Sequence, residues 1–212
     1  MKEILNLEYW NDYYKKKNLA IKPTKFAIFC KKKLKKYKGI VYDIGCGNGR
    51  DSVYFNKNKI FCIGIDKSLR AISGSKKNFS SYKNNFIKKN FCNFFKKPIK
   101  NRRFSVYSRF SLHTINYKNE KKLLDSLSNK KNLDYLFIES RTLDDELYGI
   151  GKQVGKHEFF STHYRRFIDP FILKQKLNKY FNIIYFRKSK GFAKFNKEDP
   201  CILRIIAKKK LI

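Results

Sequence analysis

With 212 residues, 42% of them hydrophobic and 17% aromatic, the chain fits one globular domain with a single substantial core. No apolar run approaches the roughly 20 residues of a membrane-spanning helix, and the N-terminus lacks the basic-then-apolar pattern of a signal peptide. We therefore exclude a membrane span and expect a cytoplasmic protein. The net charge of +33 predicts attraction to anions, among them nucleic acid, anionic membranes and acidic small molecules.

The N-terminal part of the chain has a helical pattern over residues 9–38, with a second helix beginning near Pro23 and an end at Gly39. One face of the first helix carries four aromatic residues, Tyr9, Trp10, Tyr13 and Tyr14. We therefore divide the single domain, residues 1–212, into an N-terminal helical cap, 1–38, and a core, 39–212.

From residue 40 onward, apolar strands alternate with amphipathic helices. The strands are expected at residues 40–44, 60–65, 86–91, 104–107, 135–139, 182–187 and 202–207, and the helices at 53–55, from 68 onward, at 119–128 and at 171–179. A glycine-rich loop with Gly149, Gly151 and Gly155 precedes the last helix, and we interpret it as a mobile lid over a substrate. The alternation predicts an α/β sandwich, with a mostly parallel seven-stranded sheet, helices on both faces and an antiparallel final hairpin.

Three glycines within five residues follow the first strand, in the segment 43–49, Asp-Ile-Gly-Cys-Gly-Asn-Gly. A glycine turn between a strand and a helix N-terminus lets a ligand approach backbone N–H groups at the carboxyl edge of a parallel sheet. The second strand is followed by Asp66, close to the roughly 20-residue offset at which an acidic side chain meets ribose hydroxyls in nucleotide-binding folds. The glycine spacing differs from the dinucleotide motif and from a phosphate-binding loop, so we expect another nucleoside-bearing ligand.

Segment 43–49 resembles the first motif of class I S-adenosylmethionine-dependent methyltransferases, and segment 63–68, Ile-Gly-Ile-Asp-Lys-Ser, resembles their next motif. The resemblance implies the Rossmann-like fold of that class, S-adenosyl-L-methionine as cofactor, and contacts of Asp43 with its amino end and of Asp66 with its ribose hydroxyls. The implied cofactor-binding residues are Asp43, Gly45, Cys46, Gly47, Gly49, Asp66, Lys67, Asn90, Phe91 and Tyr107. The alternative is a bare turn beside a capping aspartate.

Asn90 departs from the pattern of these methyltransferases, in which an acidic residue usually meets the adenine amino group. An amide oxygen can accept the same hydrogen bond, so the resemblance still implies a contact with adenine. The alternative for Asn90 is a plain turn residue.

Other segments give a looser indication of the acceptor. Segments 23–27, 107–113 and 191–204 resemble a bacterial group of small-molecule methyltransferases from surface-polysaccharide biosynthesis. This resemblance implies O-methylation of a small anionic acceptor, such as a sugar phosphate, a nucleotide-linked sugar or a phosphate-like capsule precursor. The Asn/Asp-Pro-Pro-aromatic segment of nucleic-acid amino methyltransferases is missing after the fourth strand. An RNA methyltransferase, whose binding would weaken steeply with salt, and a catalytically inactive binding protein stay open as alternatives.

Two residues after the fourth strand are the candidate catalytic residues. Arg109 and His113 are expected on one face of a helical turn, where Arg109 would clamp a phosphate or carboxylate and His113 would remove a proton from a hydroxyl. The alternative for Arg109 is a buried ion pair with Glu139 or Asp144, and for His113 it is a hydrogen-bonded interior position.

Further side chains are expected around the acceptor. The candidate substrate-binding residues are Tyr13, Tyr14, Arg109, Arg141, His163, Arg165 and Arg166. The aromatic stripe resembles a cap helix that closes over the sulfonium, and the alternative is an ordinary core face. The adjacent arginines Arg165 and Arg166 fit anion binding, and the alternative is a basic solvated loop.

No metal site is expected. His157, Glu158 and His163 do not have the spacing of a zinc motif, and the five cysteines include no C-x-x-C pair. We interpret the cysteines as buried, reduced thiols. The lysines are dispersed along the chain, which leaves compositional drift and a polyanion-binding surface as two interpretations of the charge.

Overall fold

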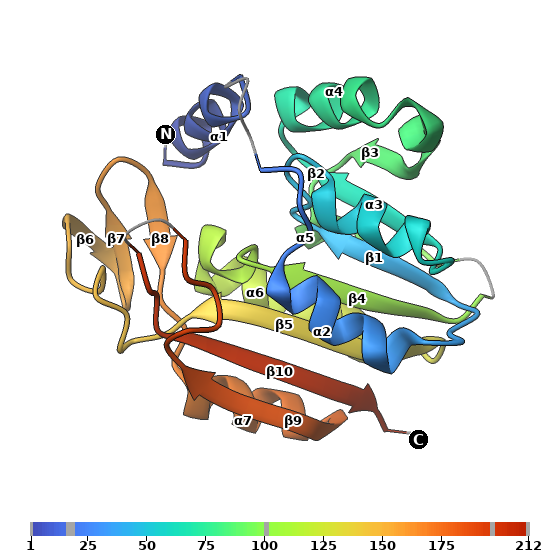
Figure 1. Ribbon diagram of the computed structural model, residues 1–212. Helices are drawn as coiled ribbons and strands as arrows, with labels where there is room; N and C mark the ends of the chain where they lie inside the picture. The colour runs from blue at the N-terminus through green and yellow to red at the C-terminus, as the bar shows by residue number, and fades with distance from the viewer. Residues whose placement is uncertain (1, 16–19, 100–101, 196–197, 211–212) are drawn as a thin grey trace.

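A seven-stranded sheet forms the centre of the computed structural model, which describes residues 2–15, 20–99, 102–195 and 198–210 (Figure 1). Its strands lie in the order β3-β2-β1-β4-β5-β10-β9. Their bounds are β1 (Ile40–Ile44), β2 (Cys62–Asp66), β3 (Phe86–Lys88), β4 (Phe104–Arg109), β5 (Leu133–Arg141), β9 (Phe181–Ser189) and β10 (Ile202–Lys209). Strands β1 to β5 pair in parallel, and β10 pairs antiparallel with β5 and β9. The predicted α/β architecture with an antiparallel final hairpin is confirmed.

Helices cover both faces of this sheet (Figure 1). They are α1 (Lys2–Tyr13), α2 (Lys25–Leu34), α3 (Arg50–Lys57), α4 (Leu69–Asn78), α5 (Phe91–Phe94), α6 (Tyr117–Ser128) and α7 (Pro170–Asn178), with the 3-10 helices η1 (Ser80–Asn85) and η2 (Leu112–Thr114). Strand residues alternate between the faces: Val41 packs with α2 and α3, whereas Tyr42 packs with α5. Leu123 of α6 and Leu173 of α7 belong to the same core cluster as Tyr42. Because both faces are buried, the strands are near-continuous apolar runs.

Side-chain caps set the starts of several helices. Thr24 Oγ1 accepts a hydrogen bond from a backbone N–H in the first turn of α2 (3.1 Å), and Ser68 Oγ does the same for α4 (3.1 Å). Asp169 accepts bonds from two N–H groups of α7, and Pro170 occupies the first turn of that helix. The predicted helix start near Pro23 is confirmed, and α7 begins at Pro170, one residue before the predicted 171.

Two predicted bounds are wrong. Helix α1 begins at Lys2 rather than at residue 9, because segment 2–13 contains no glycine or proline that would stop the helix. Strand β3 ends at Lys88 rather than at residue 91, because Asn90 accepts a hydrogen bond from the Cys92 N–H (3.0 Å) and starts α5. Residues 16–19 of the predicted helical region lie outside the described residues.

The expected glycine-rich loop is present only in part, since Gly149 and Gly151 precede β6 (Lys152–Gly155) whereas Gly155 belongs to a second, three-stranded antiparallel sheet. Its role as a lid stays a prediction. The other strands of this small sheet are β7 (Glu158–Phe160) and β8 (Tyr164–Arg166). Gly151 has a φ of 98°, and a Cβ there would lie 2.5 Å from the Phe160 carbonyl oxygen. His157 forms the turn between β6 and β7 with a φ of 60°. The glycine therefore permits a close backbone approach within a folded sheet.

A buried ion-pair cluster connects the small sheet to helices α6 and α7. Arg166 of β8 pairs with Glu120 of α6, and Arg166 Nε also donates to the carbonyl oxygen of Ile115 (2.9 Å). Lys176 of α7 donates to the other carboxylate oxygen of Glu120 (2.6 Å). Burial alone would raise the pKa of Glu120, but the charges and hydrogen bonds of Arg166 and Lys176 outweigh it and lower this pKa. One carboxylate thus joins β8, α6 and α7.

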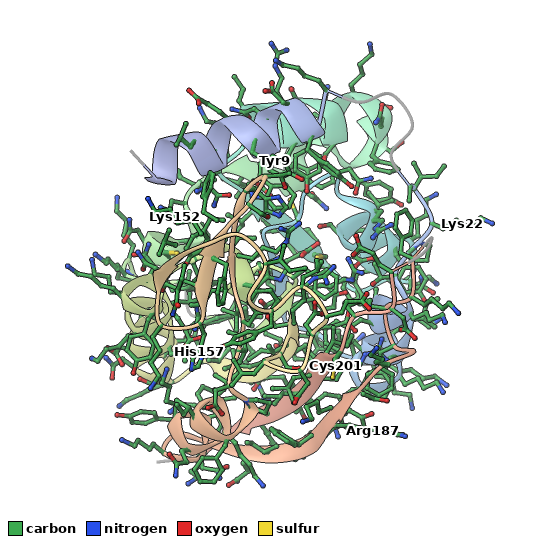
Figure 2. All side chains as sticks on the ribbon, turned by 90° about the vertical axis from the view of Figure 1, so that its left-hand side faces the viewer. Tyr9, Lys22, Lys152, His157, Arg187 and Cys201 are labelled. Carbon is green, nitrogen blue, oxygen red and sulfur yellow. The ribbon has the colours of Figure 1, made fainter. Side chains whose placement is uncertain are left out.

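Positive charge is spread over the outside of the molecule. Side chains that end in nitrogen project from many parts of the outline in Figure 2, and Lys22, Lys152 and Arg187 are labelled examples. All five cysteines are buried, as predicted, and free. No described helix is long and apolar enough to cross a membrane.

We expect Glu120→Gln to lower the free energy of unfolding by about 3 kcal/mol near neutral pH, because it leaves the buried Arg166 and the part-buried Lys176 without a full counter-charge. Since the folded pKa of Glu120 is depressed, its stabilising effect is present above the ordinary glutamate pKa and is lost as pH falls. Urea unfolding of both proteins at about pH 7 and about pH 4 measures this difference, which should shrink in acid.

The matched control is Asp125→Asn, which removes the exposed ion pair with Lys121. This change should cost less than about 0.5 kcal/mol at either pH. An equal loss of stability in both variants would contradict the assigned role of Glu120.

Candidate functional site

A cavity of about 740 Å³ lies at the carboxyl edge of the parallel strands. Asp43 from β1, Asp66 from β2, Arg109 from β4 and Arg141 from β5 all line it. The chain runs outward from β1 through β2 to β3, then crosses to β4 on the other side of β1. Ligands of open α/β sheets bind at such a change of direction, because the loops after the two neighbouring strands diverge there.

The glycine turn after β1 is left-handed at all three glycines. Gly45, Gly47 and Gly49 have φ values of 69°, 54° and 76°. A Cβ at Gly45 would lie 2.7 Å from Ser111 Cβ, and one at Gly49 would lie 2.6 Å from the ring of Phe86. The turn therefore packs directly against neighbouring elements, and it brings the N-terminus of α3 to the edge of the sheet.

Two buried carboxylates lie beside this turn. Asp66 accepts hydrogen bonds from the backbone N–H groups of Gly47 (3.0 Å) and Ser68 (2.9 Å), and Asp43 accepts one from Ser52 Oγ (2.6 Å). Burial raises the pKa of Asp43 to about 8, with a further contribution from the nearby charge of Asp51. Burial also raises the pKa of Asp66, although the hydrogen bonds from the two backbone N–H groups act to lower it. A cationic group or further donors from a ligand would favour the ionised form of both carboxylates.

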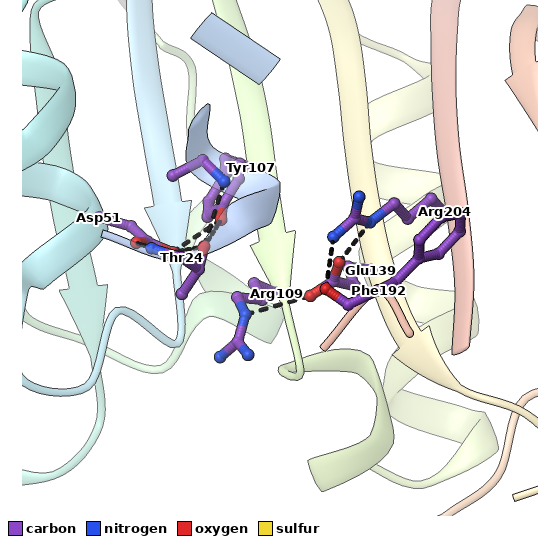
Figure 3. Close-up of polar contacts among 8 residues, drawn as sticks. Thr24, Asp51, Tyr107, Arg109, Glu139, Phe192 and Arg204 are labelled. Carbon is purple, nitrogen blue, oxygen red and sulfur yellow. Dashed lines mark hydrogen bonds and ion pairs between the residues drawn. The ribbon is translucent and has the colours of Figure 1, made fainter. Parts of the chain in front are cut away.

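Asp51 is a cavity residue that the sequence analysis missed. Its carboxylate accepts hydrogen bonds from the Thr24 N–H (2.8 Å), from Thr24 Oγ1 (2.7 Å) and from the Tyr107 hydroxyl (2.7 Å), as Figure 3 shows. The three residues line the cavity and join α3, the start of α2 and β4. An acidic residue in the first turn after the glycine motif was the available signal, because a helix N-terminus favours a carboxylate.

A second polar group lies at the ends of β4, β5 and β10. Glu139 Oε1 accepts from Arg109 Nε (3.1 Å), and Oε2 accepts from Arg204 Nε (2.6 Å) (Figure 3). The ion pair between Arg109 and Glu139 that the sequence left open therefore exists, while Arg109 still lines the cavity. Phe110 follows Arg109 with a φ of 53°, an uncommon conformation for a bulky residue.

The cavity brings together twelve of the predicted site residues. These are Tyr13, Tyr14, Asp43, Gly45, Cys46, Gly47, Asp66, Lys67, Phe91, Tyr107, Arg109 and Arg141. Gly49, Asn90, His113, His163, Arg165 and Arg166 do not line it.

His113 is not on a common helical face with Arg109, which corrects the expected geometry. Arg109 ends β4, the left-handed Phe110 turns the chain, and His113 lies in η2. Its side chain is 5% exposed and its Nδ1 has no hydrogen-bond partner among the described residues. Burial and the neighbouring Arg141 lower its pKa well below the ordinary histidine value, so the ring is neutral near pH 7.

The remaining predicted residues make contacts outside the cavity. His163 stacks on Tyr9 of α1, with ring centroids 4.0 Å apart, and Arg165 Nη1 donates to Ser161 Oγ (2.9 Å). Arg166 belongs to the buried ion-pair cluster with Glu120. Asn90 uses its amide oxygen to cap α5.

Tyr14, the residue that follows α1, contacts the glycine turn directly. A Cβ at Gly47 would lie 2.2 Å from the Tyr14 hydroxyl oxygen, so this side chain covers the turn. Asn11 Oδ1 accepts a hydrogen bond from Ser68 Oγ (2.7 Å), which ties α1 to the start of α4. Trp10 also lines the cavity, and its indole Nε1 has no partner among the described residues.

No protein-family model matches this sequence, and no similar sequence is found among curated proteins. Several solved structures are similar. An S-adenosylmethionine-dependent methyltransferase from Methanosarcina mazei is 16% identical, with a TM-score of 0.70 over 86% of this chain and 98% of that one. One from Archaeoglobus fulgidus is 20% identical, with a TM-score of 0.59 over 86% and 94%.

A third similar structure is a glycopeptide N-methyltransferase complexed with S-adenosyl-L-homocysteine. It is 12% identical, with a TM-score of 0.64 over 89% of this chain and 90% of that one. At these identities the comparisons establish the fold, which is the Rossmann-like fold of class I methyltransferases, as the sequence motifs predicted.

We expect Tyr107→Phe to lower the free energy of unfolding by about 1–2 kcal/mol, because the buried Asp51 carboxylate loses one of its donors while the aromatic ring is retained. Urea unfolding measures the change. Tyr54→Phe is the control, since the Tyr54 hydroxyl makes no hydrogen bond among the described residues. Stability equal to wild type in Tyr107→Phe would show that the hydrogen bond from the Tyr107 hydroxyl to Asp51 contributes nothing.

Proposed function

We propose that the protein is an S-adenosylmethionine-dependent methyltransferase that acts on a small anionic acceptor. The observation that carries the proposal is the joint position of Asp43, the left-handed glycine turn and Asp66 around one cavity. The fold supports the same conclusion, because its solved examples include methyltransferases with this cofactor.

The buried carboxylates fit the cofactor. Asp43 has one hydrogen bond from a side chain and a raised pKa, so the cationic amino group of S-adenosylmethionine would supply the partner that it lacks. We assign the ribose hydroxyls to Asp66, and the methionine part to the backbone of Gly45 and Gly47. Lys67, Phe91, Cys46 and Tyr107 complete the proposed site. Gly49 shapes the turn, and the contact of Asn90 with adenine stays a prediction.

The acceptor is assigned to the ends of β4 and β5. Arg109 and Arg141 line this part of the cavity, and the guanidinium of Arg109 suits an oxyanion. We propose O-methylation of a sugar phosphate, a nucleotide-linked sugar or a phosphate-like capsule precursor. The bound cofactor would supply an electrophilic methyl group, and the protein would align the acceptor oxygen with it and exclude water.

A general base is not required by this geometry. His113 does not line the cavity, and its neutral ring is the form that accepts a proton. His113 as a base, and His163, Arg165 and Arg166 as acceptor contacts, stay predictions. A transfer that depends mainly on positioning is the mechanism that the cavity supports best.

One observation favours a second candidate. The net charge of +33 and the outward-pointing nitrogens of Figure 2 would favour RNA as the acceptor. RNA binding should weaken steeply as salt rises, whereas binding of a small acceptor should change little. We favour the small acceptor over RNA. We also propose that the protein is cytoplasmic.

We expect S-adenosylmethionine and S-adenosylhomocysteine to bind with micromolar dissociation constants in calorimetric titrations. Asp66→Asn should weaken both by about 10- to 100-fold, because hydrogen bonds to a charged group contribute about 1.5–3 kcal/mol. Asp125→Asn is a control at an exposed helix position and should bind like wild type. Absence of binding to the folded wild-type protein would remove the proposed function.

The affinity for S-adenosylhomocysteine should rise with pH up to about 8. Asp43 must be ionised to pair with the ligand's amino group, and its pKa in the free protein is raised to about 8. Affinity therefore falls by up to about tenfold for each pH unit below that value, as a proton must leave on binding. Titrations between about pH 6 and 8, beside Asp43→Asn, measure this slope. A flat profile in wild type would contradict the assignment of Asp43.

A further inference from the structure

Three charged side chains form a row across neighbouring strands. The register aligns Arg109 of β4 and Arg204 of β10 with Glu139 of β5, and one carboxylate oxygen of Glu139 binds each arginine. The side chains of Glu139 and Arg204 are almost fully buried, and that of Arg109 is one-fifth exposed. Two guanidinium groups therefore share one carboxylate, and this buried row has a net positive charge.

Arg109 keeps its terminal nitrogens available to the cavity. Among the described residues only its Nε is hydrogen-bonded, and Figure 3 shows the two terminal nitrogens pointing away from Glu139. The guanidinium carbon lies 4.4 Å from the centroid of the Phe110 ring. Arg141 differs, because its terminal nitrogens bind Asp145 and Glu198. Arg109 thus presents a planar pair of donors, which matches two oxygens of a phosphate or carboxylate.

Arg204 makes a second contact that shapes the cavity wall. Its Nη2 donates to the Phe192 carbonyl oxygen (3.0 Å), and its guanidinium carbon lies 4.3 Å from the centroid of the Phe192 ring. Phe192 and Phe195 line the cavity beside Phe110, and Phe195 is 61% exposed. The same arginine therefore orients Glu139 on one side and holds an aromatic wall on the other.

We propose that the Arg109 guanidinium binds the anionic group of the acceptor, that Glu139 and Arg204 are its positioning residues, and that the acceptor carries a phosphate or carboxylate on a ring with an apolar face. The proposal rests on the proposed function. An anion at Arg109 balances the charge of the row, and Phe110 and Phe192 offer aromatic faces to the attached ring. Glu139 holds Arg109, and Arg204 holds Phe192. The distance between the guanidinium and the aromatic ring therefore sets which acceptor fits.

Binding of small probes to the protein saturated with S-adenosylhomocysteine tests the subsite. The probes are inorganic phosphate, phenyl phosphate, glucose 1-phosphate and benzoate, and the readouts are calorimetry and the fluorescence of Trp10, which is the only tryptophan and lines the cavity. Phenyl phosphate should bind at least about tenfold tighter than inorganic phosphate, because the ring contacts the aromatic wall. Comparison of phenyl phosphate with glucose 1-phosphate shows which ring is preferred, and comparison with benzoate shows whether phosphate or carboxylate is the preferred anion.

Arg204→Lys keeps the charge but loses the planar donor pair that joins Glu139 to Phe192. We expect phenyl phosphate affinity to fall by about tenfold or more, with S-adenosylhomocysteine affinity within about twofold of wild type. Arg103→Lys is the control for the substitution itself, since the exposed Arg103 pairs with Asp134 away from the cavity. This control should leave both affinities unchanged.

Each outcome decides a part of the proposal. Wild-type affinity for phenyl phosphate in Arg204→Lys would overturn the positioning role of Arg204. Equal affinity for inorganic phosphate and phenyl phosphate would overturn the proposed contact between the acceptor ring and the aromatic wall. If Arg204→Lys does not fold, Phe192→Ala replaces it: a tenfold loss of phenyl phosphate affinity supports the wall, and no loss refutes it. Failure of the proposed function is distinct, because wild type would then not bind S-adenosylhomocysteine.

Discussion

The left-handed turn at Gly45, Gly47 and Gly49 is the constraint on which the site depends. It ends β1 abruptly and starts α3 at the sheet edge, where a side chain on any of the three residues would strain the backbone. The Gly47 N–H then reaches Asp66 from the next strand, and the first turn of α3 presents Asp51 to Thr24. One local backbone conformation thus positions groups from three separate segments.

The cavity floor is acidic although the molecule as a whole is strongly basic. Asp43, Asp51 and Asp66 line the cavity and are buried, whereas the whole chain carries a net charge of +33. Each of these carboxylates has hydrogen-bond donors from the protein, but Asp43 has the fewest relative to its burial. In the proposed function this contrast gives two tasks: the basic surface would attract anions, and the acidic floor would favour a ligand that also carries positive charge.

Local patterns predicted the strands, the glycine turn, Asp66 and the helix start near Pro23, because each depends on residues close in sequence. Features that depend on distant pairing were missed. The short strands of the small sheet have too few residues for a periodic pattern, and the Asp51 network requires α2 to pack beside β4. The link between Glu139 and Arg204 follows from the register of β5 and β10, which no local pattern reveals. His113 was misplaced because a left-handed phenylalanine has no sequence signature.

Strand β10 lies between β5 and β9 in the sheet, although it follows both along the chain. A growing polypeptide that has emerged only as far as β9 therefore exposes two open strand edges at once. Helix α2 also cannot complete its packing before β10 is made, because Phe26 belongs to the same core cluster as Ile206 of β10. In co-translational folding, strand pairing in this half is complete only once β10 has been made, whereas β1 to β4 can pair earlier.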